Sequence, residues 1–127
     1  MMKKGILKNN NVHLQDHEYK TVKLLLEQGY DIELIPPSDI KGHHRPDIIL
    51  SGSEWEMKAP EGGAKNTIRH SIQNAKRQSR NIIIDLRRCK LSDSQSVIEL
   101  EYHFKLAKRL KRMKIITKDK MILDYNK

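Results

Sequence analysis

Apolar and polar positions along the chain follow a helical period in some segments and a strand period in others. A helix is predicted over residues 17–28, with Asp16 as N-cap and Gly29 as stop, because apolar side chains recur at helical spacing at Tyr19, Val22, Leu25 and Leu26. Residues 30–35 alternate as a strand does, and Pro36 and Pro37 end that strand.

The next apolar segments predict a β-hairpin. A short apolar run at residues 48–50 and a second run around Trp55 and Met57 flank the turn signal Ser51-Gly52-Ser53. Side chains alternate across a strand, so Glu56 and Lys58 share one face and Trp55 and Met57 the other. Asp47, which opens the first strand, would lie across from Glu56 in one register and on the wrong face after a one-residue slip.

The second half of the chain predicts two helices, a buried strand and a closing hairpin. A helix over residues 66–79 places Ile68, Ile72 and Ala75 inward, and the apolar strand at 81–86 that follows is predicted to be central. Ser92 to Gln95 fits a capping box for a helix reaching about Arg112, whose sheet-facing residues would be Val97, Ile98, Tyr102, Leu106, Leu110 and Met113. Residues 114–117 and 121–125 form the predicted terminal hairpin.

These elements define an α/β (α+β) fold with a small mixed sheet flanked by helices. Residues 1–15 are predicted to be a frayed lead-in, and residues 16–127 to form one domain, since 127 residues are too few for two independent cores. Cys89 is the sole cysteine, which excludes an intrachain disulfide and a cysteine-rich zinc site.

The charge balance points to a polyanionic partner. Twenty-five Lys and Arg against sixteen Asp and Glu give a net charge of +9 and a pI near 9.7. Nucleic acid is the first candidate, ahead of an anionic membrane surface, because no segment has the length of a transmembrane helix. A basic run on and around the second helix predicts a phosphate-facing surface made of Lys65, Arg69, Lys76, Arg77 and Arg80.

The hairpin carries the candidate chemistry. Asp47 and Glu56 are paired carboxylates of the kind that hold Mg²⁺, or Mn²⁺ or Zn²⁺, and Lys58 could orient water or neutralise charge on a scissile phosphate. The residues alone leave open an ordinary solvated hairpin. Glu18 lies at the edge of the first helix's buried face and could reach a cleft, although a first-turn acid interacting with the helix dipole is favoured on the pattern alone.

Pro46-Asp47 followed by Glu56-x-Lys58 resembles the signature of the PD-(D/E)XK nuclease superfamily, and the predicted order of elements matches the core of that fold. A narrower resemblance covers about Glu18 to Asp124. The chain is similar to the C-terminal nuclease domain of CdiA contact-dependent growth inhibition toxins at residues 29–34, 46–47, 55–58, 66–68, 78–87, 91–93 and 115–119.

This resemblance implies a metal-dependent endonuclease that cleaves tRNA. It assigns Asp47, Glu56 and Glu18 to the metal and Lys58 to catalysis, and it implies that Thr67 and Gln78 orient groups or contact substrate near the site. It also implies a bacterial toxin that acts in the cytoplasm of a target cell, carried by a larger secreted or mobile-element protein and neutralised by an immunity protein.

Two alternatives remain open on the sequence. The same site could cut DNA, or the chain could be a nucleic-acid-binding module that keeps the fold without catalysis. A structural or membrane-surface role is a more distant third reading.

Overall fold

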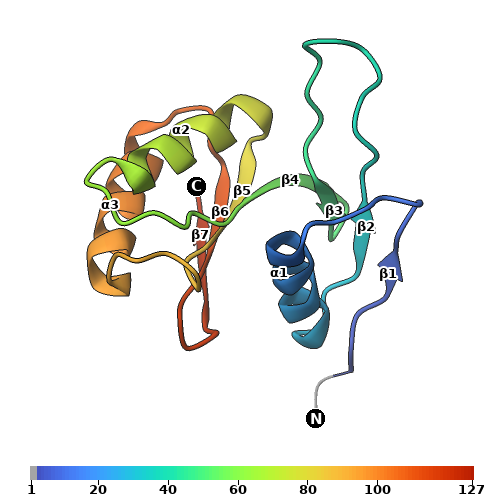
Figure 1. Ribbon diagram of the computed structural model, residues 1–127, viewed down its shortest axis with the longest axis horizontal. Helices are drawn as coiled ribbons and strands as arrows, with labels where there is room; N and C mark the ends of the chain where they lie inside the picture. Colours follow the sequence, from blue (N-terminus) through green and yellow to red (C-terminus); the bar gives the residue numbers. More distant parts are fainter. Residues whose placement is uncertain (1–2) are drawn as a thin grey trace.

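Seven strands form one mixed sheet in the computed structural model, which describes residues 3–127 (Figure 1). Strands β2 to β4 pair antiparallel, β4 to β6 parallel, and β6 with β7 antiparallel. Their order in the sheet is their order in the chain: β1 Leu7–Lys8, β2 Ile32–Leu34, β3 Ile48–Leu50, β4 Ser53–Lys58, β5 Asn81–Asp85, β6 Arg112–Ile116 and β7 Ile122–Asn126. The predicted mixed sheet is confirmed, and β5 lies between β4 and β6 as predicted.

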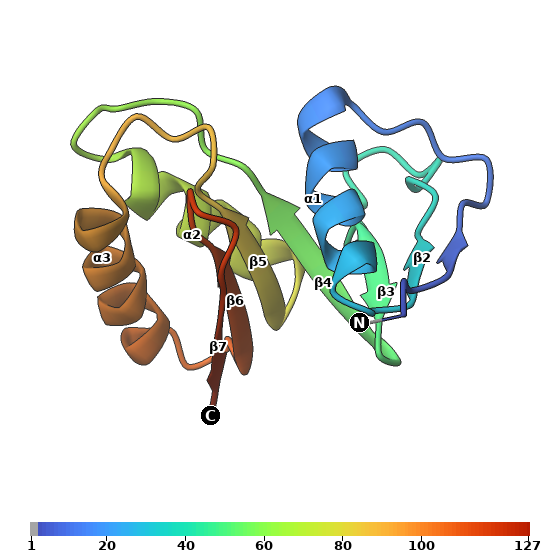
Figure 2. The same ribbon diagram turned by 90° about the horizontal axis from the view of Figure 1, so that it is seen from below.

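Three helices cover the two faces of this sheet: α1 Asp16–Glu27, α2 Thr67–Gln78 and α3 Asp93–Leu106. Helices α2 and α3 lie beside strands β5 to β7, while α1 lies beside β2 to β4 (Figures 1 and 2). On β5, Ile82 and Ile84 pack in the cluster with α2 and α3, whereas Ile83 packs in the cluster with α1. Alternate residues of one strand therefore serve two separate cores.

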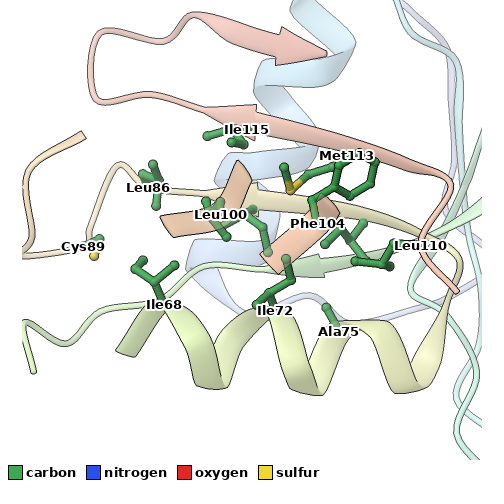
Figure 3. Close-up of a cluster of buried hydrophobic side chains, with 12 residues drawn as sticks. Ile68, Ile72, Ala75, Leu86, Cys89, Leu100, Phe104, Leu110, Met113 and Ile115 are labelled. Atoms are coloured by element: carbon green, nitrogen blue, oxygen red, sulfur yellow. The ribbon is translucent and has the colours of Figure 1, made fainter. Parts of the chain in front are cut away.

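One of the two cores lies under α2 and α3. Ile68, Ile72 and Ala75 of α2 meet Leu100 and Phe104 of α3 above the sheet, and all five are almost fully buried (Figure 3). The predicted inward face of α2 is thereby confirmed. This packing fixes the position of α2. The C-terminal end of the helix, at Gln78, borders the candidate site.

The β3–β4 hairpin has the predicted tight turn. Ser51 and Gly52 both have positive φ, at 51° and 82°, as a two-residue turn of the primed type requires. The turn sets the register that pairs Ile48 with Trp55 and Leu50 with Ser53.

The prediction for α3 was wrong in its end and in part of its buried face, although Val97 packs against the core, and Leu110 and Met113, which lie beyond the helix, are buried as predicted. The helix stops at Leu106 because the chain must turn over residues 107–111 to bring Arg112 into the sheet beside β5. Its buried residues are Ser96, Leu100 and Phe104, whereas Ile98, Tyr102 and Leu106 are 69%, 61% and 60% exposed. Ser92 does cap the helix, accepting a hydrogen bond from the backbone N–H of Gln95 at 3.3 Å.

The N-terminal prediction also needs correction. Leu7–Lys8 is not frayed but pairs parallel with β2, and the Gly5 N–H donates to the Leu26 carbonyl at 2.8 Å. A Cβ at Gly5 would lie 1.7 Å from the Tyr30 carbonyl oxygen, so only glycine allows this approach. Residues 1 and 2 of the predicted lead-in lie outside the described residues.

Helix α1 begins one residue earlier than predicted, with Gln15 and not Asp16 as its N-cap. Tyr19, predicted to face inward, is 53% exposed. The buried stripe is instead Thr21, Val22, Leu24 and Leu25.

Candidate active site

Asp47 and Glu56 face each other at the open end of the hairpin. The register that pairs Ile48 with Trp55 continues by one residue, so Asp47 lies opposite Glu56 on the same face of the sheet. The Asp47 N–H donates to the Trp55 carbonyl at 3.1 Å, and the Met57 N–H donates to Asp47 Oδ2 at 2.8 Å. These two bonds fix the Asp47 carboxylate, and they confirm the register that the sequence left open.

Burial makes this carboxylate pair costly to ionise. The Glu56 side chain is only 3% exposed, and within residues 3–127 its one cationic neighbour at ion-pair distance is Lys58, whose Nζ lies 3.2 Å from Oε2. Burial first, and repulsion from Asp47 second, raise the pKa of Glu56 to about 8. Burial also raises the pKa of Asp47. Without a cation, Glu56 therefore holds a proton near neutral pH and shares it with Asp47.

Gln78 supports Glu56 from the end of α2. With its amide nitrogen turned toward the carboxylate, Gln78 donates to Glu56 Oε2 at 2.7 Å and to Oε1 at 3.3 Å. The neighbouring Ser79 and Asn81 side chains donate to the Glu54 carbonyl at 3.1 and 3.0 Å. The end of α2 is thus tied to β4 directly beside the carboxylate that it contacts.

Glu18 lines the same pocket as the carboxylate pair, and it also has the structural role that the sequence pattern favoured. One of its oxygens, Oε1, accepts the Gln15 N–H at 2.9 Å and so caps α1. The pocket has a volume of about 270 Å³ and is lined by His17, Glu18, Thr21, Asp47, Glu56, Met57, Lys58, Ala59, Pro60, Ser71 and Arg88.

A buried polar network holds α1 against the sheet beside this pocket. Asp85, at the end of β5, accepts a hydrogen bond from Thr21 Oγ1 at 2.6 Å. It also forms an ion pair with Arg87 Nη2 at 2.8 Å. Arg87 Nη2 also donates to the Lys20 carbonyl at 2.8 Å. Because Glu18 is one helical turn before Thr21, this network also fixes the position of Glu18 beside the pocket.

Sequence reasoning did not assign a role to Thr21, Asp85 or Arg88. The signal for this network was Asp85 itself, which follows the apolar run of residues 82–84 in a buried strand. A buried charge requires a partner, so such a carboxylate predicts a polar contact. Arg88 lines the pocket while its Nε donates to the Ala59 carbonyl at 2.8 Å.

Of the residues predicted to bind nucleic acid on and around α2, Gln78 contacts Glu56, and the others do not line the carboxylate pocket. Ser71 and Gln78 of α2 approach the site, and residues two positions apart on a helix lie roughly 200° apart. Arg69 and Lys76, two residues before them, therefore point away from it. Thr67 lies beside Gly62, Lys65 and Arg77 are exposed, and Arg80 lines a separate hollow with Gln78 and Arg109.

The donor set fits a hard divalent cation in its chemistry. Two adjacent carboxylates, short of compensating positive charge, are oxygen ligands of the type that Mg²⁺ and Mn²⁺ take. Within residues 3–127, no three His, Cys, Asp or Glu side chains converge as a ready ligand group. Glu18 is held by its capping bond, so it would have to turn toward the pair to become a third ligand.

The fold and this acidic pocket in a basic chain define a small α/β domain with a candidate active site, and the comparisons give its family. The family model for the contact-dependent growth inhibition CdiA C-terminal domain matches residues 44–122, a span that contains Asp47, Glu56 and Lys58. The chain therefore belongs to the CdiA C-terminal domain family and is a toxin domain of contact-dependent growth inhibition.

A solved structure has the same fold. One chain of the CdiA-CT/CdiI toxin and immunity complex from Burkholderia pseudomallei superposes with a TM-score of 0.71 at 19% identity, covering 97% of this chain and 100% of that chain. A comparison with curated proteins found no match. Among the described residues, no helix has the length and apolar character needed to cross a membrane.

Proposed function

We propose that this domain is a divalent-metal-dependent endonuclease of the PD-(D/E)XK type that hydrolyses phosphodiester bonds in tRNA. The observation that carries the proposal is buried Glu56 beside half-buried Asp47, with Lys58 Nζ 3.2 Å from Glu56, in a pocket that Glu18 also lines. Toxin domains of this family are generally enzymes, which agrees with a catalytic reading of the pocket.

Each side chain has a separate task in this mechanism. Asp47 and Glu56 would hold the cation, with Glu18 as a further acid; when bound, the cation supplies Lewis acidity and positive charge to the phosphate. Gln78 and the Met57 N–H hold the two carboxylates in one orientation, so the ligand set is preorganised. Lys58, 28% exposed, can meet the scissile phosphate from the pocket side and stabilise its growing negative charge.

The substrate class rests on charge and on resemblance. A net charge of +9 suits any nucleic acid, and the similarity to CdiA nuclease domains at residues 29–34, 46–47, 55–58 and 78–87 favours tRNA over DNA. In this proposal the domain is delivered by a larger protein and acts in the cytoplasm of the recipient bacterium.

A cognate immunity protein is the expected protein partner. The similar structure is a toxin and immunity complex, and a producing cell that makes a nuclease toxin needs protection from it. Because the chain is strongly basic, an acidic immunity protein would associate quickly and at rates that fall with salt.

The test is incubation of total tRNA and of plasmid DNA with the purified domain, in Mg²⁺, in Mn²⁺ and in EDTA. We expect metal-dependent cleavage of tRNA that is lost in both Glu56→Gln and Lys58→Ala. Glu54→Gln, an exposed carboxylate on the same strand, is the matched control and should cleave normally.

The alternative outcomes are equally informative. Cleavage of plasmid alone would keep the site and transfer the activity to DNA. Intact substrates with salt-sensitive binding would contradict catalysis and leave a nucleic-acid-binding module. Unchanged cleavage in both variants would refute the residue assignment.

A further inference from the structure

The carboxylate pocket opens into a longer groove that follows α1. A second hollow, of about 320 Å³, shares His17, Ala59 and Arg88 with the carboxylate pocket. A third hollow, of about 160 Å³, shares Lys20 and Arg87 with the second. Each hollow shares lining residues with the next, and together the three make up a groove that runs from the carboxylates along α1.

Basic side chains come from both walls of this groove. We call it the α1 groove, and its cationic residues are Lys20, Lys23, Arg87, Arg88 and Lys120. Asp85 neutralises much of the Arg87 charge, whereas Lys20, Lys23 and Lys120 are exposed and form no ion pair with any residue in 3–127. Asp16, Asp85 and Glu27 are the acids along the second and third hollows, so the walls carry an excess of positive charge.

We propose that the α1 groove binds the phosphate backbone of the nucleic acid strand that leaves the carboxylate pocket. This inference rests on the proposed nuclease function and adds the direction in which the substrate runs. From His17 to Lys23 the helix rises roughly 9 Å at 1.5 Å per residue. At about 3.4 Å of rise per nucleotide, that length spans two to three phosphates.

The composition of the groove favours backbone recognition over base reading. Among residues 3–127, His17 is the one aromatic side chain that lines the second or third hollow, so the groove offers no row of aromatic rings on which successive bases could stack. Lysines at the walls act as point charges, which suits phosphates of any sequence. The basic residues on α2 do not share this position, because Arg69 and Lys76 point away from the carboxylates.

The test compares two triple variants that each lower the net charge by three. Lys20→Ala/Lys23→Ala/Lys120→Ala removes exposed charges of the groove, and Lys65→Ala/Arg69→Ala/Arg77→Ala removes exposed charges on and beside α2. Binding of total tRNA is measured in EDTA over a range of salt concentrations, with thermal unfolding as a check that both variants fold.

The groove variant should bind tRNA about tenfold more weakly at 0.1 M salt, and its plot of log affinity against log salt should be shallower by about two, as expected for the loss of two to three phosphate contacts. The α2 variant should lose less than about threefold, through reduced long-range attraction alone. Equal losses in the two variants, or a larger loss on α2, would overturn the inference.

Cleavage assays with the wild type separate this inference from the proposed function. If the wild type cleaves and the groove variant binds normally, the groove assignment fails while the nuclease stands, and an acidic protein surface becomes the candidate occupant of the groove. If the wild type binds through the groove but never cleaves, the nuclease proposal fails and the groove stands. If the wild type does not bind nucleic acid, both fail.

Discussion

Replacing Glu56 with Gln should stabilise the metal-free protein, and the stabilisation should grow with pH. The pKa of Glu56 lies near 8 in the folded protein against an ordinary value of 4.5, because the side chain is 3% exposed and faces Asp47. A folded-state pKa that is raised means that the folded protein keeps a proton that the unfolded chain releases. The associated stability is complete below about pH 4.5 and is lost as pH rises through about 8.

The magnitude follows from linkage. A full shift of roughly three and a half pKa units corresponds to about 5 kcal/mol above pH 8, at 1.36 kcal/mol per unit. Between pH 6 and pH 9 the wild type should lose on the order of 2 kcal/mol through this one group. Glu56→Gln carries no titrating proton, so its stability advantage over the wild type should widen by that amount.

The assay is urea unfolding in EDTA at pH 6 and pH 9 for the wild type, Glu56→Gln and the control Glu54→Gln. Glu54 is exposed on the same strand, so its variant should track the wild type at both pH values. Added Mg²⁺ or Mn²⁺ should restore wild-type stability at pH 9 and do less for Glu56→Gln. A difference between wild type and Glu56→Gln that stays flat across this pH range would refute the account of a buried, proton-sharing pair.

Three further predictions test other parts of the structure. The Mg²⁺ concentration for half-maximal cleavage should fall as pH rises from 6 to 9, since metal ligands bind deprotonated and Glu56 must lose its proton; a constant requirement would separate Glu56 from the metal. Thr21→Val should cost about 1–3 kcal/mol in urea unfolding, because it removes the hydroxyl that donates to buried Asp85, and no loss would mean that Arg87 alone satisfies this carboxylate. Leu100→Ala should cost about 2–5 kcal/mol in the same assay, and Ile98→Ala less than about 0.5 kcal/mol; the reverse ranking would restore the face of α3 predicted from sequence.

Local patterns in the sequence were sufficient for the central elements. The Ser51-Gly52 turn between two apolar runs specified the β3–β4 hairpin, because few residues tolerate positive φ and the turn length fixes the register. The apolar run of residues 82–84 within β5 marked a strand buried on both faces, as it proved to be. The hairpin carries Asp47, Glu56 and Lys58, so the core of the candidate site was readable from the sequence.

Helix α3 shows where patterning failed. Ile98, Tyr102 and Leu106 form an apolar stripe at helical spacing, but the face that packs contains Ser96, Leu100 and Phe104. A helix with apolar residues on more than one face does not reveal which face will meet the sheet, and the stop at Leu106 depends on where β6 must begin. The buried face of α3 and its C-terminal end were both decided by the packing of the helix against α2 and the sheet.

The sequence by itself determined a basic α/β domain with paired carboxylates on a hairpin, because turn chemistry and strand alternation act between near neighbours. Only the tertiary structure decided that Gln78 contacts Glu56, that Thr21 and Arg87 meet on Asp85, and that the hollows along α1 join the carboxylate pocket. The Gln78–Glu56 and Thr21–Asp85 contacts join residues that are 22 and 64 positions apart in the chain. The periodicity of apolar residues within one segment does not specify contacts between distant segments. The packing of α1 and α2 on opposite faces of one sheet creates these contacts.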